Sequence, residues 1–102
     1  MNYSEPGFEI TLTENVLRCS GKLEKSNYTD VDKFLREVDQ AVHDELCIID
    51  LTELHFLNSS GIKSLATFML GSPKKFEIRI NDTITWQTQS IPALTFLKPN
   101  QI

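Results

Sequence analysis

Residues Leu46–Leu70 read LCIIDLTELHFLNSSGIKSLATFML and contain a complete transition from a strand to a helix. The first four residues, Leu46 to Ile49, form a short apolar run that closes on Asp50 and Leu51, with the length and character of a strand buried on both faces. The apolar residues of the second half recur at helical spacing: Ile62, Leu65, Ala66 and Met69. The stretch therefore predicts a buried strand followed by an amphipathic helix.

A polar segment, Asn58-Ser59-Ser60-Gly61, separates the strand from the helix. Such side chains are favoured at a helix start because their oxygens accept hydrogen bonds from backbone N–H groups that lack a partner. We predict a helix from about Ser60 to Leu70 whose first turn displays two serine hydroxyls. The pattern leaves two interpretations open, namely that these hydroxyls cap the helix or that they form a functional site.

Length and composition indicate one domain of an ordinary globular protein, with 102 residues, 40% hydrophobic and 24% charged. A chain of this length can bury roughly two-thirds of its unfolded surface. No apolar run approaches the ~20 residues of a membrane span, and the first residues lack the basic start and apolar core of a signal peptide. The net charge of −4 disfavours binding to nucleic acid or to an anionic membrane. We therefore expect a cytoplasmic protein.

The two cysteines, Cys19 and Cys47, both lie in predicted strands among apolar neighbours. They are best interpreted as small buried residues of a reduced cytosolic protein, not as a disulfide or a metal pair. The sequence has no metal-ligand spacing and no glycine-rich phosphate loop, so we expect neither a metal nor a cofactor.

The N-terminal part predicts a hairpin followed by a helix. Residues 1–7 are expected to be a loose lead-in, and Phe8–Thr13 alternates apolar and polar residues as a half-buried strand does. A turn at Glu14-Asn15 leads into a second strand from Val16 to about Leu23. A helix is expected to begin with Thr29 as its cap.

The C-terminal part is expected to add one strand and two short turns. Phe76–Ile80 alternates again and predicts a fourth strand. In the segment 81–102, Asn81 or Asp82 could begin a helix, but Pro92 interrupts it, and Pro99 is expected to end whatever precedes it. The strand–helix–strand order predicts parallel pairs beside the hairpin. We therefore expect a single α/β domain over 1–102, with a mixed sheet of four or five strands and helices mainly on one face.

The pattern of the whole chain resembles the STAS domain family, the fold of anti-sigma-factor antagonists and of sulphate-transporter tails. The resemblance covers about residues 8–97 and rests on Gly21-Lys22-Leu23 after the second strand, on the strand Cys47–Leu51, and on the helix start at Asn58–Gly61. In the antagonist branch, a partner kinase that is also the anti-sigma factor phosphorylates a serine at this helix start, and a phosphatase reverses the reaction.

Carried over by position, the resemblance implies that Ser59 is the phosphoacceptor, with Ser60 as the alternative. Position 58 is Asn where the family usually has Asp, which keeps the shape of the residue and removes a negative charge. The polar residues at the start and along the outer face of the helix are the predicted partner-binding surface: Asn58, Ser59, Ser60, Lys63, Ser64 and Thr67.

We therefore predict a non-enzymatic STAS-like signalling protein of the partner-switching type, which binds a serine kinase of the anti-sigma type and a phosphatase. Variants of this hypothesis are an unphosphorylated adaptor and a homodimer. An alternative from another class is a domain that senses a nucleotide or lipid in the crevice at the strand ends. A hydrolase using Ser59 and His55 is less favoured, because nothing indicates an oxyanion site or a pocket. Asp50 and Glu53 are an equally weak candidate for an acid pair.

Overall fold

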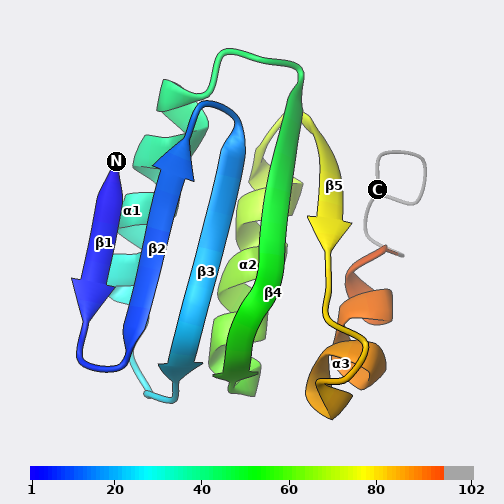
Figure 1. The fold of residues 1–102 in the computed structure, drawn as a ribbon. Helices are drawn as coiled ribbons and strands as arrows, with labels where there is room; N and C mark the ends of the chain where they lie inside the picture. The colour runs from blue at the N-terminus through cyan, green and yellow to red at the C-terminus, as the bar shows by residue number, and fades with distance from the viewer. Residues whose placement is uncertain (96–102) are drawn as a thin grey trace.

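Five strands form one mixed sheet in the computed structural model, which describes residues 1–95 (Figure 1). The predicted stop at Pro99 lies outside these residues. The strands are β1 (Asn2–Glu5), β2 (Phe8–Thr13), β3 (Val16–Leu23), β4 (Leu46–Leu57) and β5 (Lys75–Arg79). The helices are α1 (Thr29–Ala41), α2 (Ser59–Gly71) and α3 (Thr85–Thr95).

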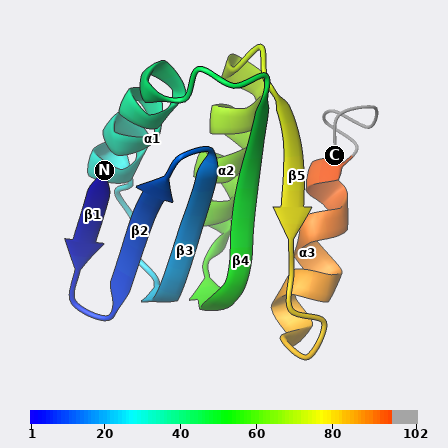
Figure 2. The same ribbon diagram turned by 45° about the horizontal axis from the view of Figure 1, so that its top comes forward.

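The sheet has the strand order β1-β2-β3-β4-β5, antiparallel from β1 to β3 and parallel from β3 to β5. Helices α1 and α2 make the two parallel connections and pack side by side on one face of the sheet, whereas α3 lies beside β5 (Figure 2). This arrangement confirms the predicted α/β class, the mixed sheet and the placement of the helices mainly on one face. Of the two predicted numbers of strands, four or five, the sheet has five.

The core lies between the sheet and the pair α1 and α2. Where the strands are regular, alternate residues point into it, including Ile10, Leu17 and Ile49, each of which is buried. Helix α1 contributes an apolar stripe of residues at helical spacing, among which Val38 is completely buried. The opposite face of the sheet is uncovered by α1 and α2, so the apolar residues of β4 on that side are only partly buried, as at Ile48.

The prediction of a loose lead-in over residues 1–7 is wrong, because Asn2–Glu5 forms the edge strand β1 and pairs antiparallel with β2. The backbone N–H of Leu12 donates to the carbonyl of Met1 at 2.9 Å, and the ring of Tyr3 packs against that of Phe34 with centroids 5.8 Å apart. An edge strand with one covered face needs few apolar residues, so β1 carries little hydrophobic pattern.

The predicted cap of α1 is also wrong. Thr29 is the first residue of the helix, and the cap position belongs to Tyr28, whose side chain makes no capping bond. The amide oxygen of Asn27 accepts hydrogen bonds from the backbone N–H and the hydroxyl of Thr29, at 2.8 and 2.6 Å. Asn27 therefore satisfies the helix start from outside the helix.

Strand β4 continues to Leu57, six residues past the predicted end at Leu51. Its register with β3 shifts twice, between Arg18 and Ser20 and between Gly21 and Lys22. Strand β5 pairs only with the first part of β4, from Leu46 to Asp50. The second half of β4 therefore has a free edge on the side of β5.

Side chains from the segment around α3 cover this free edge. The buried amide of Gln87 donates to the carbonyls of Leu51 and Leu54 at 2.7 and 2.8 Å, and accepts from the N–H of Asn81 at 2.8 Å. Asn81 donates to the carbonyl of Thr52 at 3.3 Å. The indole of Trp86 donates to the carbonyl of His55 at 2.8 Å. The side chains thus take the place of a neighbouring strand.

The predicted two short turns after β5 are replaced by the single helix α3, which contains Pro92. Proline removes one hydrogen bond of a helix interior and disfavours the preceding turn. The helix nevertheless packs closely against the rest of the domain, because Gln87, Ile91 and Leu94 are all buried. Tertiary contacts therefore outweigh the local effect of the proline.

Replacement of Gln87 by Glu tests the role of this amide with almost no change in shape. The variant should lose about 2–4 kcal/mol of unfolding free energy, because a carboxylate cannot donate to the carbonyls of Leu51 and Leu54. The loss should shrink as the pH falls, since a protonated carboxyl can donate again. Urea denaturation at several pH values measures the effect, with the exposed Gln89→Glu as control. Equal stability of the two variants would contradict the prediction.

Candidate functional site

The start of α2 is organised by the side chain of Asn58. Its amide oxygen accepts from the backbone N–H of Gly61 at 3.2 Å, and also from the hydroxyl of Tyr28. Its amide nitrogen donates to the carbonyl of Lys25 at 2.8 Å. Asn58 therefore caps α2 and ties the loop between β3 and α1 to it.

The same loop is attached to the edge strand. The ammonium of Lys25 lies 2.9 Å from the carboxylate of Glu5, and it sits over the ring of Tyr28 at 5.8 Å from the centroid. Hydrogen bonds from the Tyr3 hydroxyl and the Lys25 ammonium hold the pKa of Glu5 below its ordinary value. A continuous set of contacts thus connects β1, the loop and the first turn of α2.

Gly61 is required by close packing. A Cβ atom at this position would overlap the side chain of Leu57 and approach the hydroxyl of Tyr28 to 2.8 Å. Only glycine allows the first turn of α2 to lie this close to the end of β4. Hydrogen bonding therefore explains the Asn at the first position of the Asn-Ser-Ser-Gly segment, and close packing explains the Gly at its last position.

The two serines between them have no such structural role. Ser59 is exposed and Ser60 is half-buried, and within residues 1–95 neither hydroxyl makes a hydrogen bond. The interpretation of Ser59 or Ser60 as the helix cap is wrong, because Asn58 provides the cap. The first turn of α2 also lacks acidic residues.

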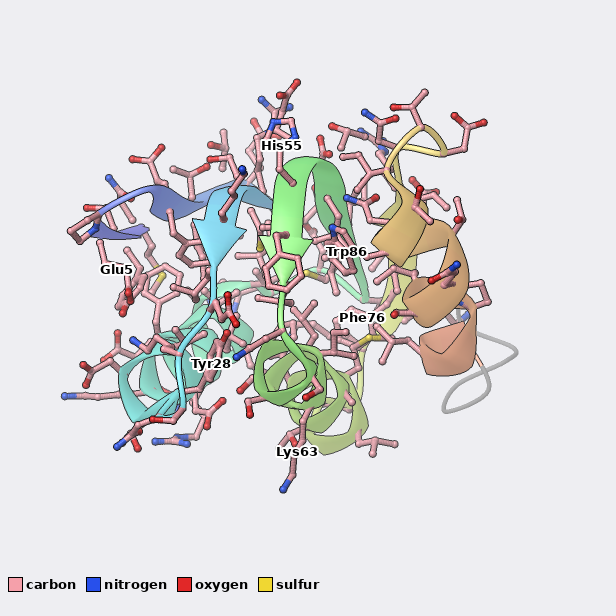
Figure 3. All side chains as sticks on the ribbon, turned by 90° about the horizontal axis from the view of Figure 1, so that it is seen from below. Glu5, Tyr28, His55, Lys63, Phe76 and Trp86 are labelled. Carbon is pink, nitrogen blue, oxygen red and sulfur yellow. The ribbon has the colours of Figure 1, made fainter. Side chains whose placement is uncertain are left out.

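The remaining predicted residues lie on different sides of α2. Lys63 and Thr67 are exposed, and Lys63 projects from the side of α2 that faces away from the sheet (Figure 3). Ser64 is only 7% exposed and faces α1. Its place on the outer face was therefore predicted wrongly, since a hydroxyl gives a residue polar character even where the helix packs.

A groove runs between α1 and α2 and consists of two adjoining hollows. The larger has a volume of about 360 Å³ and is lined by Asp32, Leu35, Arg36, Asp39, Gln40, Ser64, Thr67, Phe68 and Gly71. The smaller, of about 210 Å³, lies at the helix starts and is lined by Ser26, Tyr28, Asp32, Ser60, Lys63, Ser64 and Thr67. Because Asp32, Ser64 and Thr67 line both hollows, we treat them as one α1–α2 groove.

Two polar groups inside the α1–α2 groove lack a partner. Among the described residues, the hydroxyl of Ser64 makes no hydrogen bond, and the carboxylate of the half-buried Asp32 makes neither a hydrogen bond nor an ion pair. Asp39, by contrast, lies 3.0 Å from the ammonium of Lys74. The groove was not predicted from the sequence, because it arises only where two helices distant in the chain pack together.

The suggested acid pair is not formed. Asp50 accepts hydrogen bonds from the N–H and hydroxyl of Thr52, at 3.0 and 2.6 Å, and from Arg18 at 3.2 Å, whereas Glu53 is exposed. Burial alone would raise the pKa of Asp50, but these hydrogen bonds outweigh it and hold the pKa below its ordinary value. Asp50 therefore serves as a structural anion on the uncovered face.

His55 and the two cysteines are poorly placed for catalysis with Ser59. The side chain of His55 points to the uncovered face of the sheet and makes no hydrogen bond to a described residue (Figure 3). Burial raises the pKa of Cys19 to about 12 and that of Cys47 to about 11, so both are protonated thiols at neutral pH. Neither thiol is bonded to another.

Comparison with known proteins adds no assignment, since no family model and no curated protein matches the chain. Within residues 1–95, the acidic, histidine and cysteine side chains form no cluster of three or more that could hold a metal ion. Over the same residues, no helix is long and apolar enough to cross a membrane.

Replacement of Asn58 by Asp tests why this position carries an amide. The variant should lose about 1–2 kcal/mol of unfolding free energy, because a carboxylate cannot donate to the carbonyl of Lys25. The matched control is Asn27→Asp, where the amide only accepts hydrogen bonds, from Thr29, at a helix start. This control should be neutral or slightly stabilising. Thermal and urea unfolding measure both, and a stable Asn58→Asp protein would contradict the assigned role.

Replacement of Ser64 by Ala tests whether its hydroxyl is unpaired. The variant should gain about 0.5–1.5 kcal/mol of unfolding free energy, because it removes a buried polar group without a partner and introduces a better helix former. Thr67→Ala, on the exposed part of the same helix, should gain only the contribution of helix propensity, about 0.5 kcal/mol. A destabilised Ser64→Ala protein would show that the hydroxyl has a structural partner.

Proposed function

We propose that the protein is a STAS-like signalling module of the cytoplasm that acts by reversible protein binding at the start of α2, with phosphorylation of Ser59 as the switch. The observation that carries this proposal is that Ser59 is the exposed first residue of α2 and that its hydroxyl makes no hydrogen bond among the described residues. Since Asn58 provides the cap, the hydroxyl of Ser59 is available to a partner.

A phosphate on Ser59 is compatible with the fold. It would add about −1.5 to −2 charges at neutral pH. The helix dipole favours an anion at this position by about 0.3–1 kcal/mol, and the first turn of α2 has no acidic residue to oppose it. Lys63 lies one turn further along the same helix. Phosphorylation would therefore leave the domain folded.

The consequence of the phosphate would fall on the bound partner. An interface shaped around a neutral hydroxyl would have to accept a doubly charged group, so the surface would exchange one partner for another. The partners that this mechanism requires are a serine kinase of the anti-sigma type and a phosphatase. Ser60 is half-buried and is therefore a poorer acceptor than Ser59.

The Asn at position 58 is compatible with the same proposal. The amide nitrogen donates to the carbonyl of Lys25, a bond that the Asp usual in the family could not make. The residue still orders the turn that presents Ser59. The departure from the family pattern therefore has a structural reason within this chain.

The test is the intact mass of the protein purified from its native host under conditions that preserve phosphate, followed by peptide mapping. We expect a fraction heavier by one phosphate, located on Ser59 and absent from Ser59→Ala. The matched control, Ser60→Ala, should retain the phosphate. An unmodified protein in every growth state, combined with unchanged partner capture by Ser59→Ala and Ser59→Asp, would refute the proposed switch.

A further inference from the structure

The α1–α2 groove contains a polar group that neither the fold nor the switch at Ser59 uses. Ser64 is 7% exposed and lines both hollows of the groove, and its hydroxyl makes no hydrogen bond to any residue in 1–95. Buried polar side chains in native proteins nearly always have a partner, because an unpaired one is costly. The hydroxyl of Ser64 is therefore available to a ligand that enters the groove.

Other side chains in the groove specify the chemistry of that ligand. Asp32 presents an unpaired, half-buried carboxylate, which is an acceptor only. The walls beside it are apolar where Leu35 and Phe68 line the larger hollow. A suitable ligand thus has an apolar stem and a positively charged end that can donate hydrogen bonds.

The charged groups around the groove fit this assignment. The two cations that line it, Arg36 and Lys63, are exposed, so their charges lie in water at the rim. Asp39 is occupied by Lys74. An anionic ligand is disfavoured because it would have to approach the unpaired carboxylate of Asp32.

We propose that the α1–α2 groove receives an arginine side chain of a partner protein. Its stem would pack on Leu35 and Phe68, and its guanidinium would donate to the carboxylate of Asp32 and to the hydroxyl of Ser64. Arginine suits the site because its planar group carries five N–H donors and can reach two acceptors at once. This inference rests on the proposed protein-binding function and names the chemistry of the partner.

The test is a titration of the ¹⁵N-labelled full chain with N-acetyl-arginine methylamide, followed by NMR. We expect saturable shifts at groove residues, and much smaller ones with the uncharged citrulline analogue. Asp32→Asn should weaken binding at least about fivefold, the equivalent of one half-buried charged contact. The matched control is Asp30→Asn, which removes an exposed acid from the same turn outside the groove and should leave binding unchanged.

Ser64→Ala distinguishes a binding role from a structural one. The variant should bind the arginine probe more weakly while remaining at least as stable as the parent protein. Absence of shifts at the groove, equal shifts with the citrulline analogue, or unchanged binding by Asp32→Asn would each overturn the proposal. Because the probe contains no partner protein and Ser59 is unmodified throughout, these results are independent of the mass measurement that tests the switch.

Discussion

Strand β4 is longer than its neighbour β5, and much of the structure depends on how the remaining edge is covered. Beyond Asp50, the carbonyls on this edge would lie in a partly buried place without a neighbouring strand. Gln87 and Trp86 supply donors for them from α3, which is held against the sheet by the same contacts. The extra length of β4 also carries the chain to Asn58 and so determines where α2 begins.

Asn58 follows the end of β4 and connects it to the candidate site at the start of α2. One amide both accepts from Gly61 and Tyr28 and donates to Lys25, so it joins three segments at the point where the serines are displayed. A carboxylate would lose one of these bonds, and a hydroxyl would be too short to make all three. Asn58 therefore holds together the local structure around the two serines.

The sequence predicted those parts of the fold whose signal is local and periodic. Phe8–Thr13 alternates because one face of β2 is buried, and α2 shows the spacing of a packed helix. Strand β1 and the second half of β4 were missed, because an edge strand needs little apolar pattern and two register shifts break the period of two. The prediction of two short turns around Pro92 was wrong, because the tertiary contacts of α3 outweigh the local effect of the proline. The helix-start pattern led to the prediction of the serines as a site, whereas the groove depends on packing that no single segment encodes.

Ser59 and Ser64 represent two kinds of unpaired hydroxyl. The exposed hydroxyl of Ser59 can bond to water, so its lack of a protein partner has little energetic cost and shows only that the group is accessible. The hydroxyl of Ser64 is removed from most solvent, so the domain bears a cost that an alanine would avoid. Departures from local optimality of this kind concentrate at functional sites. The two residues lie on successive turns of α2, with Ser59 exposed at the start of the helix and Ser64 buried against α1, so the helix presents one accessible hydroxyl and one enclosed hydroxyl.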